Sequence, residues 1–446
     1  MSAEVRLEPR NPDSAVPLSG LQREFWRNFE KTKYSERMCH GEVRLHRAAD
    51  PTLLQESLNI LIQRHEVLRT RYTLVDCVPQ AQIDSASDAA LEVSDLEGHQ
   101  GHADEEVLQI AEQFLLQKID LSVGPLFSAK LLRLPNHEGV LLLASDHIIS
   151  DGASTSILCA ELCTIYQQLC GHSVVSLPKP LLQFADLAIW QARAQEQWLN
   201  EHQAYWKRYL LGAPSTRLPT DRATGNLPNI GAKILPVPFG HPLSTAFRAS
   251  ARSAQTLPSL VALTIYVALM SRWCGLDELI LYVVTHNRCR PELRLMVGPI
   301  VGFTPLRIRV RNDDTLLDLI ARVRSEFHAV CKHQSFDVCP PGCDSVETDL
   351  LFRWLPDAGK LQLPNHARPD DLEIRVQPFD FWSSRYEDLK LTMFFSETSA
   401  GVVATIVYRD NRFSAETIEQ LRQWLLLFSE QLVRDPRSRI LNLPRL

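Results

Sequence analysis

A histidine and an aspartate stand four residues apart in the segment Ser145–Ser154, directly after a short apolar run. The imidazole of His147 can take or guide a proton near neutral pH, so it is a candidate acid–base group. Asp151 could orient that imidazole or brace the turn by pairing with a cation. Gly152 permits a close approach of the backbone. Since a His and an Asp at this spacing also occur by chance, the pair alone leaves a purely structural turn open.

The elements around the pair place it where α/β proteins often carry their sites. The apolar run 139–145 predicts a buried strand, and the pattern over 154–169 predicts a helix, so His147 and Asp151 lie on the turn between them. Similar patterns recur along the chain and predict helices over 50–71, 260–273 and 415–433, the last capped by Ser414, and a strand over 279–284. This alternation predicts an α/β fold.

The length of the chain predicts more than one folding unit. The 446 residues are 45% hydrophobic and 22% charged, the composition of a globular protein with a large core. Such a length is typical of two or three domains, or of one doubled architecture. The region 171–183 contains Ser176–Pro180 and has no regular pattern, so we place a boundary there and predict domains over 1–175 and 176–446.

Charge, apolar segments and cysteines exclude several classes of protein. The net charge of −6 argues against a nucleic-acid-binding surface. The N-terminus lacks the apolar stretch of a signal peptide, and the segment 257–270 is too short to cross a membrane, so it is predicted to be a buried helix. Among the ten cysteines, the closely spaced Cys339 and Cys343 have no second Cys or His pair at metal-site distance from them. We therefore expect a cytoplasmic protein without membrane, nucleic-acid or metal partners.

The segment Ser145–Ser154 is one of six that follow one another in a characteristic order. The other five are Leu18–Trp26 (compare S-x-A-Q-x-R-x-W), Arg64–Tyr72 (RHExLRTxF), Phe184–Trp190 (Y-x-D-[FY]-A-x-W), Val297–Arg307 (VGxFVNTxxxR) and His333–Gln334 (HQ). Together with an HHxxxDG-like segment, they resemble the motifs of the condensation domains of nonribosomal peptide synthetases. Because six motifs match in order, chance is excluded as an explanation.

The resemblance implies a fold and a set of partners. It implies two chloramphenicol-acetyltransferase-like lobes that form a V-shaped pseudo-dimer with a tunnel at their interface. A carrier protein would present an acyl thioester on its phosphopantetheine arm at one mouth, and a small amine or alcohol would enter at the other. The chain itself would bind no cofactor.

The resemblance also implies roles for individual residues. His147 matches the catalytic second His of the signature, which removes a proton from the nucleophile or orients it and stabilises the tetrahedral intermediate. Asp151 would be structural and would pair with Arg307, and Gly152 would keep the helix start close to the reacting carbonyl. Asp146 replaces the first His, which is mostly a supporting residue, and its carboxylate could raise the pKa of His147.

Three functions stay open at this point. The first is condensation of a carrier-bound acyl group with an amine or alcohol, giving an amide or an ester. The second is O-acylation with a coenzyme A or polyketide-carrier donor, although Asp380–Trp382 lacks the glycines of the acetyltransferase DFGxG motif. The third is recruitment of another enzyme without chemistry. Since no carrier-protein or adenylation motif is present, we expect a freestanding monomer that recruits its carrier protein in trans.

Overall fold

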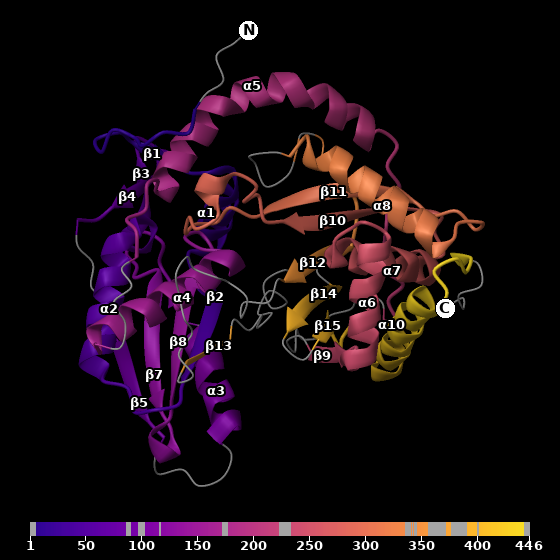
Figure 1. Cartoon of the computed structure of the whole chain (residues 1–446). Coiled ribbons are helices and arrows are strands. Elements are labelled where there is room, and N and C mark those ends of the chain that lie inside the picture. Colours follow the sequence, from indigo (N-terminus) through magenta and orange to yellow (C-terminus); the bar gives the residue numbers. More distant parts are fainter. Residues whose placement is uncertain are drawn as a thin grey trace.

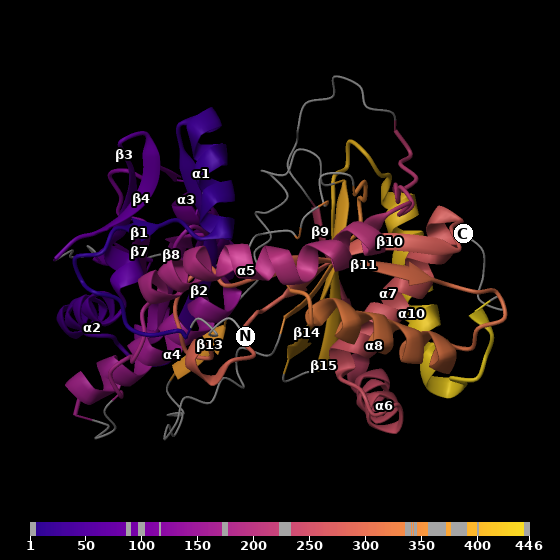
Figure 2. The ribbon, with the colours of Figure 1, turned by 90° about the horizontal axis from the view of Figure 1, so that it is seen from above.

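The computed structural model describes residues 6–85, 91–96, 103–115, 117–171, 177–222, 233–334, 340, 342, 346–355, 372–375, 390–398 and 401–440. Two lobes lie side by side, and the long helix α5 (Phe184–Leu210) arches over both (Figure 1). Seen from above, α5 runs across the gap between the lobes (Figure 2). Each lobe consists of a sheet with helices packed on it, which confirms the predicted α/β class.

The N-terminal lobe is built on a mixed sheet. Its strand order is β13 (Leu372–Arg375), β2 (Ser35–Leu45), β8 (Gly139–Asp146), β7 (Phe127–Arg133) and β5 (Leu91–Asp95), with β6 (Lys118–Ile119) paired to β2. Helices α2 (Pro51–Arg64), α3 (Ala103–Leu115) and α4 (Gly152–Leu169) pack around it. A smaller sheet of β1 (Val16–Pro17), β4 (Val78–Ile83) and β3 (Thr70–Val75) lies beside α1 (Gly20–Thr32). Every residue of β8 is buried, as expected for a central strand.

The C-terminal lobe repeats this plan. Its strand order is β11 (Gly302–Arg309), β10 (Glu278–Thr285), β12 (Leu351–Leu355), β14 (Leu391–Thr398), β15 (Gly401–Tyr408) and β9 (Lys233–Pro238). The helices that pack with it in one hydrophobic core are α6 (Gly240–Ser253), α7 (Pro258–Cys274), α8 (Leu316–Cys331) and α10 (Ala415–Arg434). Twelve residues of α7 are buried, so the segment 257–270 is confirmed as part of a core helix.

Segments from the C-terminal part of the chain complete the N-terminal lobe, so the lobes do not divide at one point of the sequence. Strand β13 comes from the C-terminal part of the chain and pairs with β2 of the N-terminal lobe. Residues 293–300 follow the short 3-10 helix Pro291–Leu293 and add four apolar side chains to the N-terminal core. Helix α5 buries its first half, up to Ala194, in that core and its second half, from Trp198, in the C-terminal core. The division into 1–175 and 176–446 stays a prediction, and residues 172–176 lie outside the described part of the chain.

Gly298 is closely packed against Phe184, where the segment 293–300 joins the N-terminal core. Its φ of 156° lies in a region that favours glycine, and a Cβ there would approach Phe184 Cδ2 to 2.0 Å. We expect Gly298→Ala to lower the free energy of unfolding by about 1–3 kcal/mol, since overpacking forces neighbouring groups to move. Denaturant titration measures this effect. Gly171→Ala is the control, because Gly171 also has a positive φ but no atom within 4 Å of its Cβ position; equal losses in both variants would contradict the packing argument.

Most predicted elements are confirmed, with one correction at the end of α2. Strand β8, helices α4 and α7, strand β10 and helix α10 lie where the sequence places them, and the Ser414 side chain caps α10 by accepting from the Thr417 N–H. The helix predicted over 50–71 is too long, because α2 ends at Arg64 and is followed by a 3-10 turn (Glu66–Arg69) and β3. Tertiary contacts end the helix there: the Arg64 guanidinium donates to Glu161, and His65 Nε2 lies 2.6 Å from the same carboxylate.

Two findings on the described residues concern membranes and metals. Among their helices, none is by itself long and apolar enough to cross a bilayer; α6 and α7 reach that length and hydropathy only as a pair, and the pair is bent by 103°. In the same part of the chain, no three His, Cys, Asp or Glu side chains form a group that could hold a metal ion. The segments with Cys339, Cys343 and Asp380–Trp382 lie outside the described residues.

Candidate active site at the junction of the lobes

His147 lies on the turn between β8 and α4, as predicted. Its side chain is buried, and Nδ1 lies 2.7 Å from the carbonyl oxygen of Ser150. Because a carbonyl only accepts hydrogen bonds, Nδ1 donates and carries the proton, and Nε2 then carries the lone pair. The ring also stacks on Phe25 of α1, with centroids 4.8 Å apart. The fold therefore fixes both the tautomer and the orientation of the imidazole.

The environment of His147 favours its neutral form. Burial is the main cause that lowers its pKa, while the Asp151 carboxylate acts in the opposite direction and Arg353 adds to the lowering. The sequence suggested that Asp146 could raise the pKa of His147, whereas this pKa is lowered and Asp146 is not among the main causes of its shift. The Asp146 carboxylate turns back onto its own turn, where Oδ1 accepts from the Ile148 N–H at 2.9 Å.

The lowered pKa of His147 predicts how its ring titrates. We expect the imidazole of His147 to protonate with a midpoint below the usual 6.5, measured by NMR of 13C-histidine-labelled protein and assigned with His147→Gln. The unfolded chain then binds this proton more readily than the folded one, so the stability contributed by neutral His147 falls as pH drops below 6.5. A midpoint above 6.5 would contradict the burial argument and favour the influence of Asp146.

Asp151 is a buried structural carboxylate whose partner is Arg288. The Arg288 Nη2 lies 2.8 and 3.0 Å from the two carboxylate oxygens, and Asp151 has no exposed surface. The N–H groups of Ser154 and Ile300 and the Ser154 hydroxyl also donate to it, at 2.7, 3.1 and 2.8 Å. These donors outweigh the effect of burial and hold the pKa of Asp151 below its usual range. Asp151 thus ties the start of α4 to a segment of the other lobe's chain.

The predicted pairing of Asp151 with Arg307 is wrong. Arg307 lies on β11, where its guanidinium donates to Glu278 and to the carbonyls of Tyr209, Leu211 and Gly212. Strand β11 runs antiparallel to β10 and places Arg307 opposite Ile280, five residues before the end of β10. Since a strand rises about 3.3 Å per residue, Arg307 lies roughly 16 Å from the end that meets the other lobe. Arg288 follows that end by three residues, but only the three-dimensional arrangement of the strands brings that end to Asp151.

Gly152 and Asp151 begin α4 together. Asp151 is the N-cap of the helix, and Gly152 is its first residue. A Cβ on Gly152 would come within 3.3 Å of Arg353 Nη2 from β12. The glycine therefore leaves room for a side chain of the C-terminal lobe, whereas its predicted closeness to a reacting carbonyl stays a prediction.

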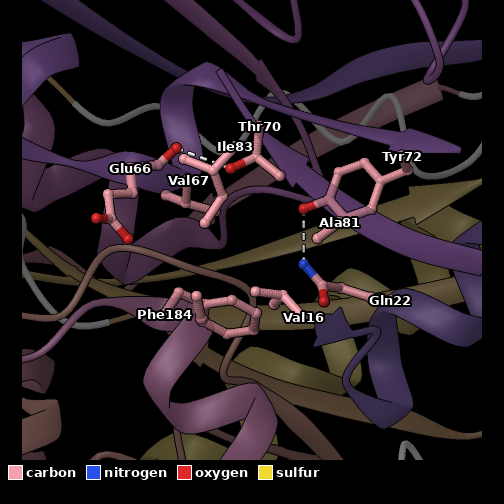
Figure 3. Close-up of a pocket in the computed structure, with 10 residues that line it drawn as sticks. Val16, Gln22, Glu66, Val67, Thr70, Tyr72, Ala81, Ile83 and Phe184 are labelled. Atoms are coloured by element: carbon pink, nitrogen blue, oxygen red, sulfur yellow. Dashed lines mark hydrogen bonds between the residues drawn. The ribbon is translucent and has the colours of Figure 1, made fainter. Parts of the chain in front are cut away.

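Gln22 and Tyr72, which the sequence did not assign to the site, support the turn that carries His147. The Gln22 amide donates to the Ile148 carbonyl at 2.9 Å and to the Tyr72 hydroxyl at 2.7 Å, and that hydroxyl also donates to Ile148. Figure 3 shows Gln22 and Tyr72 pointing toward one another beside a small pocket. The pocket has a volume of about 10 Å³, room for a single water, so it is too small for an acyl chain.

Residues of three other motifs make capping, hydrogen-bonding and packing contacts. In Leu18–Trp26, the Ser19 hydroxyl and the Gln22 side chain form a capping box at the start of α1. In Arg64–Tyr72, His65 is buried against Glu161. His333 stacks on Tyr205 at 3.7 Å between ring centroids, next to His202.

Comparison with known proteins identifies the family. Residues 13–444 match the family model of the Condensation domain, and the chain therefore belongs to the condensation-domain family. It is 28% identical to a linear gramicidin synthase protein of Brevibacillus parabrevis over 459 residues, which is 99% of this chain and 9% of that protein. It is 30% identical to malpibaldin synthetase of Mortierella alpina, over 90% of this chain and 7% of that protein. The chain thus spans less than a tenth of the length of these two relatives.

Solved structures share the fold. The X-domain from teicoplanin biosynthesis matches with a TM-score of 0.80 at 23% identity, over 99% of this chain and all of that chain. The first condensation domain of the CDA synthetase matches with a TM-score of 0.78 at 16% identity, over 98% of this chain and all of that chain. The predicted family and its two-lobed fold are confirmed, while the tunnel between the lobes stays a prediction.

Proposed function

We propose that this condensation domain transfers an acyl group from a thioester on the phosphopantetheine arm of a carrier protein to a small amine or alcohol. Membership of the family supports acyl transfer that forms amide or ester bonds in natural-product biosynthesis. The observation that carries the proposal for this chain is the fixed tautomer of His147. Its Nδ1 is held by the Ser150 carbonyl, so the lone pair of Nε2 can accept a proton from a nucleophile.

In the proposed reaction, the imidazole of His147 is the group of this chain that interacts with the nucleophile. The nucleophile donates its N–H or O–H hydrogen bond to Nε2 of His147, which orients it or takes the proton as the nucleophile attacks the thioester carbon. A C–N or C–O bond forms, the C–S bond breaks, and the proton passes to the leaving thiolate. The neutral form that burial imposes on His147 is the form that can accept this proton. Asp151 and Arg288 support the turn and do not touch the reacting atoms in this scheme.

A transfer assay followed by mass spectrometry tests the proposed function. The purified protein is mixed with acyl groups on a carrier protein, on coenzyme A and on free pantetheine, together with a panel of amines and alcohols. We expect product from the carrier-bound donor in preference to the other two. Product from coenzyme A thioesters at an equal or higher rate would contradict the carrier proposal and favour the O-acyltransferase. Supplying the carrier as a separate protein also tests the prediction that it acts in trans.

A recruiting role is the second candidate, and one observation favours it. Asp146 stands where the family signature has its first His, and an X-domain with the same fold is known in a complex with OxyB. Under this alternative the chain would bind a partner enzyme and no product would form from any donor. We favour catalysis, because His147 is present and held in an orientation and tautomer suited to proton transfer.

A further inference from the structure

Helix α1 contacts the turn that carries His147 at two points. The Gln22 side chain donates to the Ile148 carbonyl at 2.9 Å. One turn further along the helix, the Phe25 ring stacks on the His147 imidazole, with centroids 4.8 Å apart and planes inclined by 28°. Gln22 and Phe25 are three residues apart, so they lie on the same face of the helix. One helical face thus holds the backbone of the turn and covers its imidazole.

The first turns of α1 are anchored in the N-terminal lobe. A capping box that includes Gln22 fixes the start of the helix, and the Gln22 amide also donates to the buried Tyr72 hydroxyl at 2.7 Å. Trp26, which follows Phe25, is 6% exposed and belongs to the N-terminal core. Because Phe25 lies between two anchored residues, its ring is held at a fixed place relative to His147.

Phe25 covers one face of the imidazole. Its side chain packs against the N-terminal core but is only partly buried, whereas His147 is 3% exposed. A partly exposed ring that stacks on a buried one shields the covered face from water. Since burial is the main cause that lowers the pKa of His147, this cover favours the neutral imidazole.

Charged and titratable groups from several elements surround the same turn. They are Cys39 on β2, Tyr72 on β3, Asp146 on β8, Asp151 before α4, Arg353 on β12, and His286 and Arg288 behind β10. Burial raises the pKa of Cys39 and of Tyr72 and lowers that of His286, so all three are neutral at neutral pH. The pKa of Asp151 lies below its usual range, so this carboxylate is charged. Near neutral pH these charges are therefore constant, and the titration of His147 depends on how well its own ring is covered.

We propose that Phe25 is a positioning residue for acyl transfer: its ring holds the His147 imidazole in the orientation in which Nε2 meets the nucleophile, and keeps water from one face of that imidazole. The inference rests on the proposed function, in which His147 accepts the proton. The Ser150 carbonyl holds one edge of the imidazole at Nδ1, and the stacked ring of Phe25 restricts its rotation. Such restraint matters because a small misplacement of a reacting group slows the reaction strongly.

Single-turnover transfer by variants of α1 tests this role. Rates are measured over a range of pH, from an acyl-loaded carrier protein to an acceptor that does not titrate in that range. Phe25→Leu keeps apolar bulk but lacks the flat ring, so its rate should fall about 10- to 100-fold even where the imidazole is fully neutral. The low-pH limb of its profile should also move up by about half a unit to one unit, because water reaches the imidazole. Phe25→Tyr, which keeps the ring, should stay near the wild type in both respects.

Phe29→Leu is the matched control. Phe29 lies on the same helix, is also partly buried against the N-terminal core, and packs on Trp26 with centroids 5.3 Å apart. Its replacement should leave the rate of transfer and the pH profile unchanged. Equal losses of rate in Phe25→Leu and Phe29→Leu, with no shift of the low-pH limb in either, would indicate weaker packing of the helix and overturn the proposal.

NMR of 13C-histidine-labelled protein gives a readout that does not depend on activity. The ring current of Phe25 should displace the His147 signals, and Phe25→Leu should lose this displacement and raise the midpoint at which His147 titrates. His147→Gln assigns these signals and separates them from those of His286. Unchanged signals and an unchanged midpoint in Phe25→Leu would overturn the proposal. The NMR changes without product from any donor would overturn the proposed function and support the covering role of Phe25.

Discussion

Replacing His147 with alanine should reduce the rate of acyl transfer by about 10²- to 10⁴-fold, the usual contribution of a positioned acid–base group. The variant loses the lone pair of Nε2, while the backbone of the turn keeps its own supports from Gln22 and the Asp146 carboxylate. Single-turnover transfer from a loaded carrier protein measures the effect on the chemical step. Thermal unfolding of the same preparation shows whether the fold is retained.

A second histidine serves as the control for this prediction. His46 has 43% of its side chain exposed, and His46→Ala should transfer at the wild-type rate. If His147→Ala retained full activity with an intact fold, the assignment of His147 as the acid–base group would be wrong. If its activity and its stability both collapsed, His147→Gln, which keeps a polar side chain of similar reach, would separate chemistry from folding.

Replacing Asp151 with alanine should cost about 3–5 kcal/mol of unfolding free energy, the typical result of leaving one member of a buried ion pair alone. Arg288 would stay with only 9% of its side chain exposed and without its carboxylate, and the N–H groups of Ser154 and Ile300 would lose an acceptor. Urea titration of the wild type and the variant measures this loss. Activity should fall mainly because less of the variant is folded.

A double-mutant cycle identifies the partner of Asp151. We expect strong coupling between Asp151→Ala and Arg288→Ala, so that the double variant loses much less stability than the sum of the two single losses. Arg307→Ala is the control, because its guanidinium is bound to Glu278 and should show additive losses with Asp151→Ala. Coupling with Arg307 instead of Arg288 would contradict the geometry of the site.

The sequence alone identifies the position of His147 correctly, because the residues that determine this position are close together in the chain. An apolar run of strand length followed by a polar turn and a helical pattern predicts a strand, turn and helix, and β8 and α4 form these elements. The order of the six motifs identifies the family, which the match over residues 13–444 confirms. Local patterns and motif order were sufficient for both conclusions.

The partner of Asp151 could not be predicted in the same way. The choice between Arg288 and Arg307 depends on which end of β10 meets the other lobe. Only the three-dimensional arrangement of β10 and β11 shows which end this is. The end of α2 was missed for a similar reason, since contacts of Arg64 and His65 with Glu161 override the helical pattern up to Arg71. Arg353 belongs to no motif, and its approach to Gly152 follows from the packing of two distant segments.

Parallel measurement of binding and chemistry tests the central claim most directly. The affinity of the wild-type protein for an acyl-loaded carrier protein is determined by titration, and the rate of acyl transfer from that carrier is measured under single-turnover conditions, each also with His147→Ala. The account predicts that both proteins bind the carrier with similar affinity and that only the wild type forms product at an appreciable rate. Tight binding by the wild type without product from any donor or acceptor would contradict catalysis and assign the junction of the lobes to recruitment.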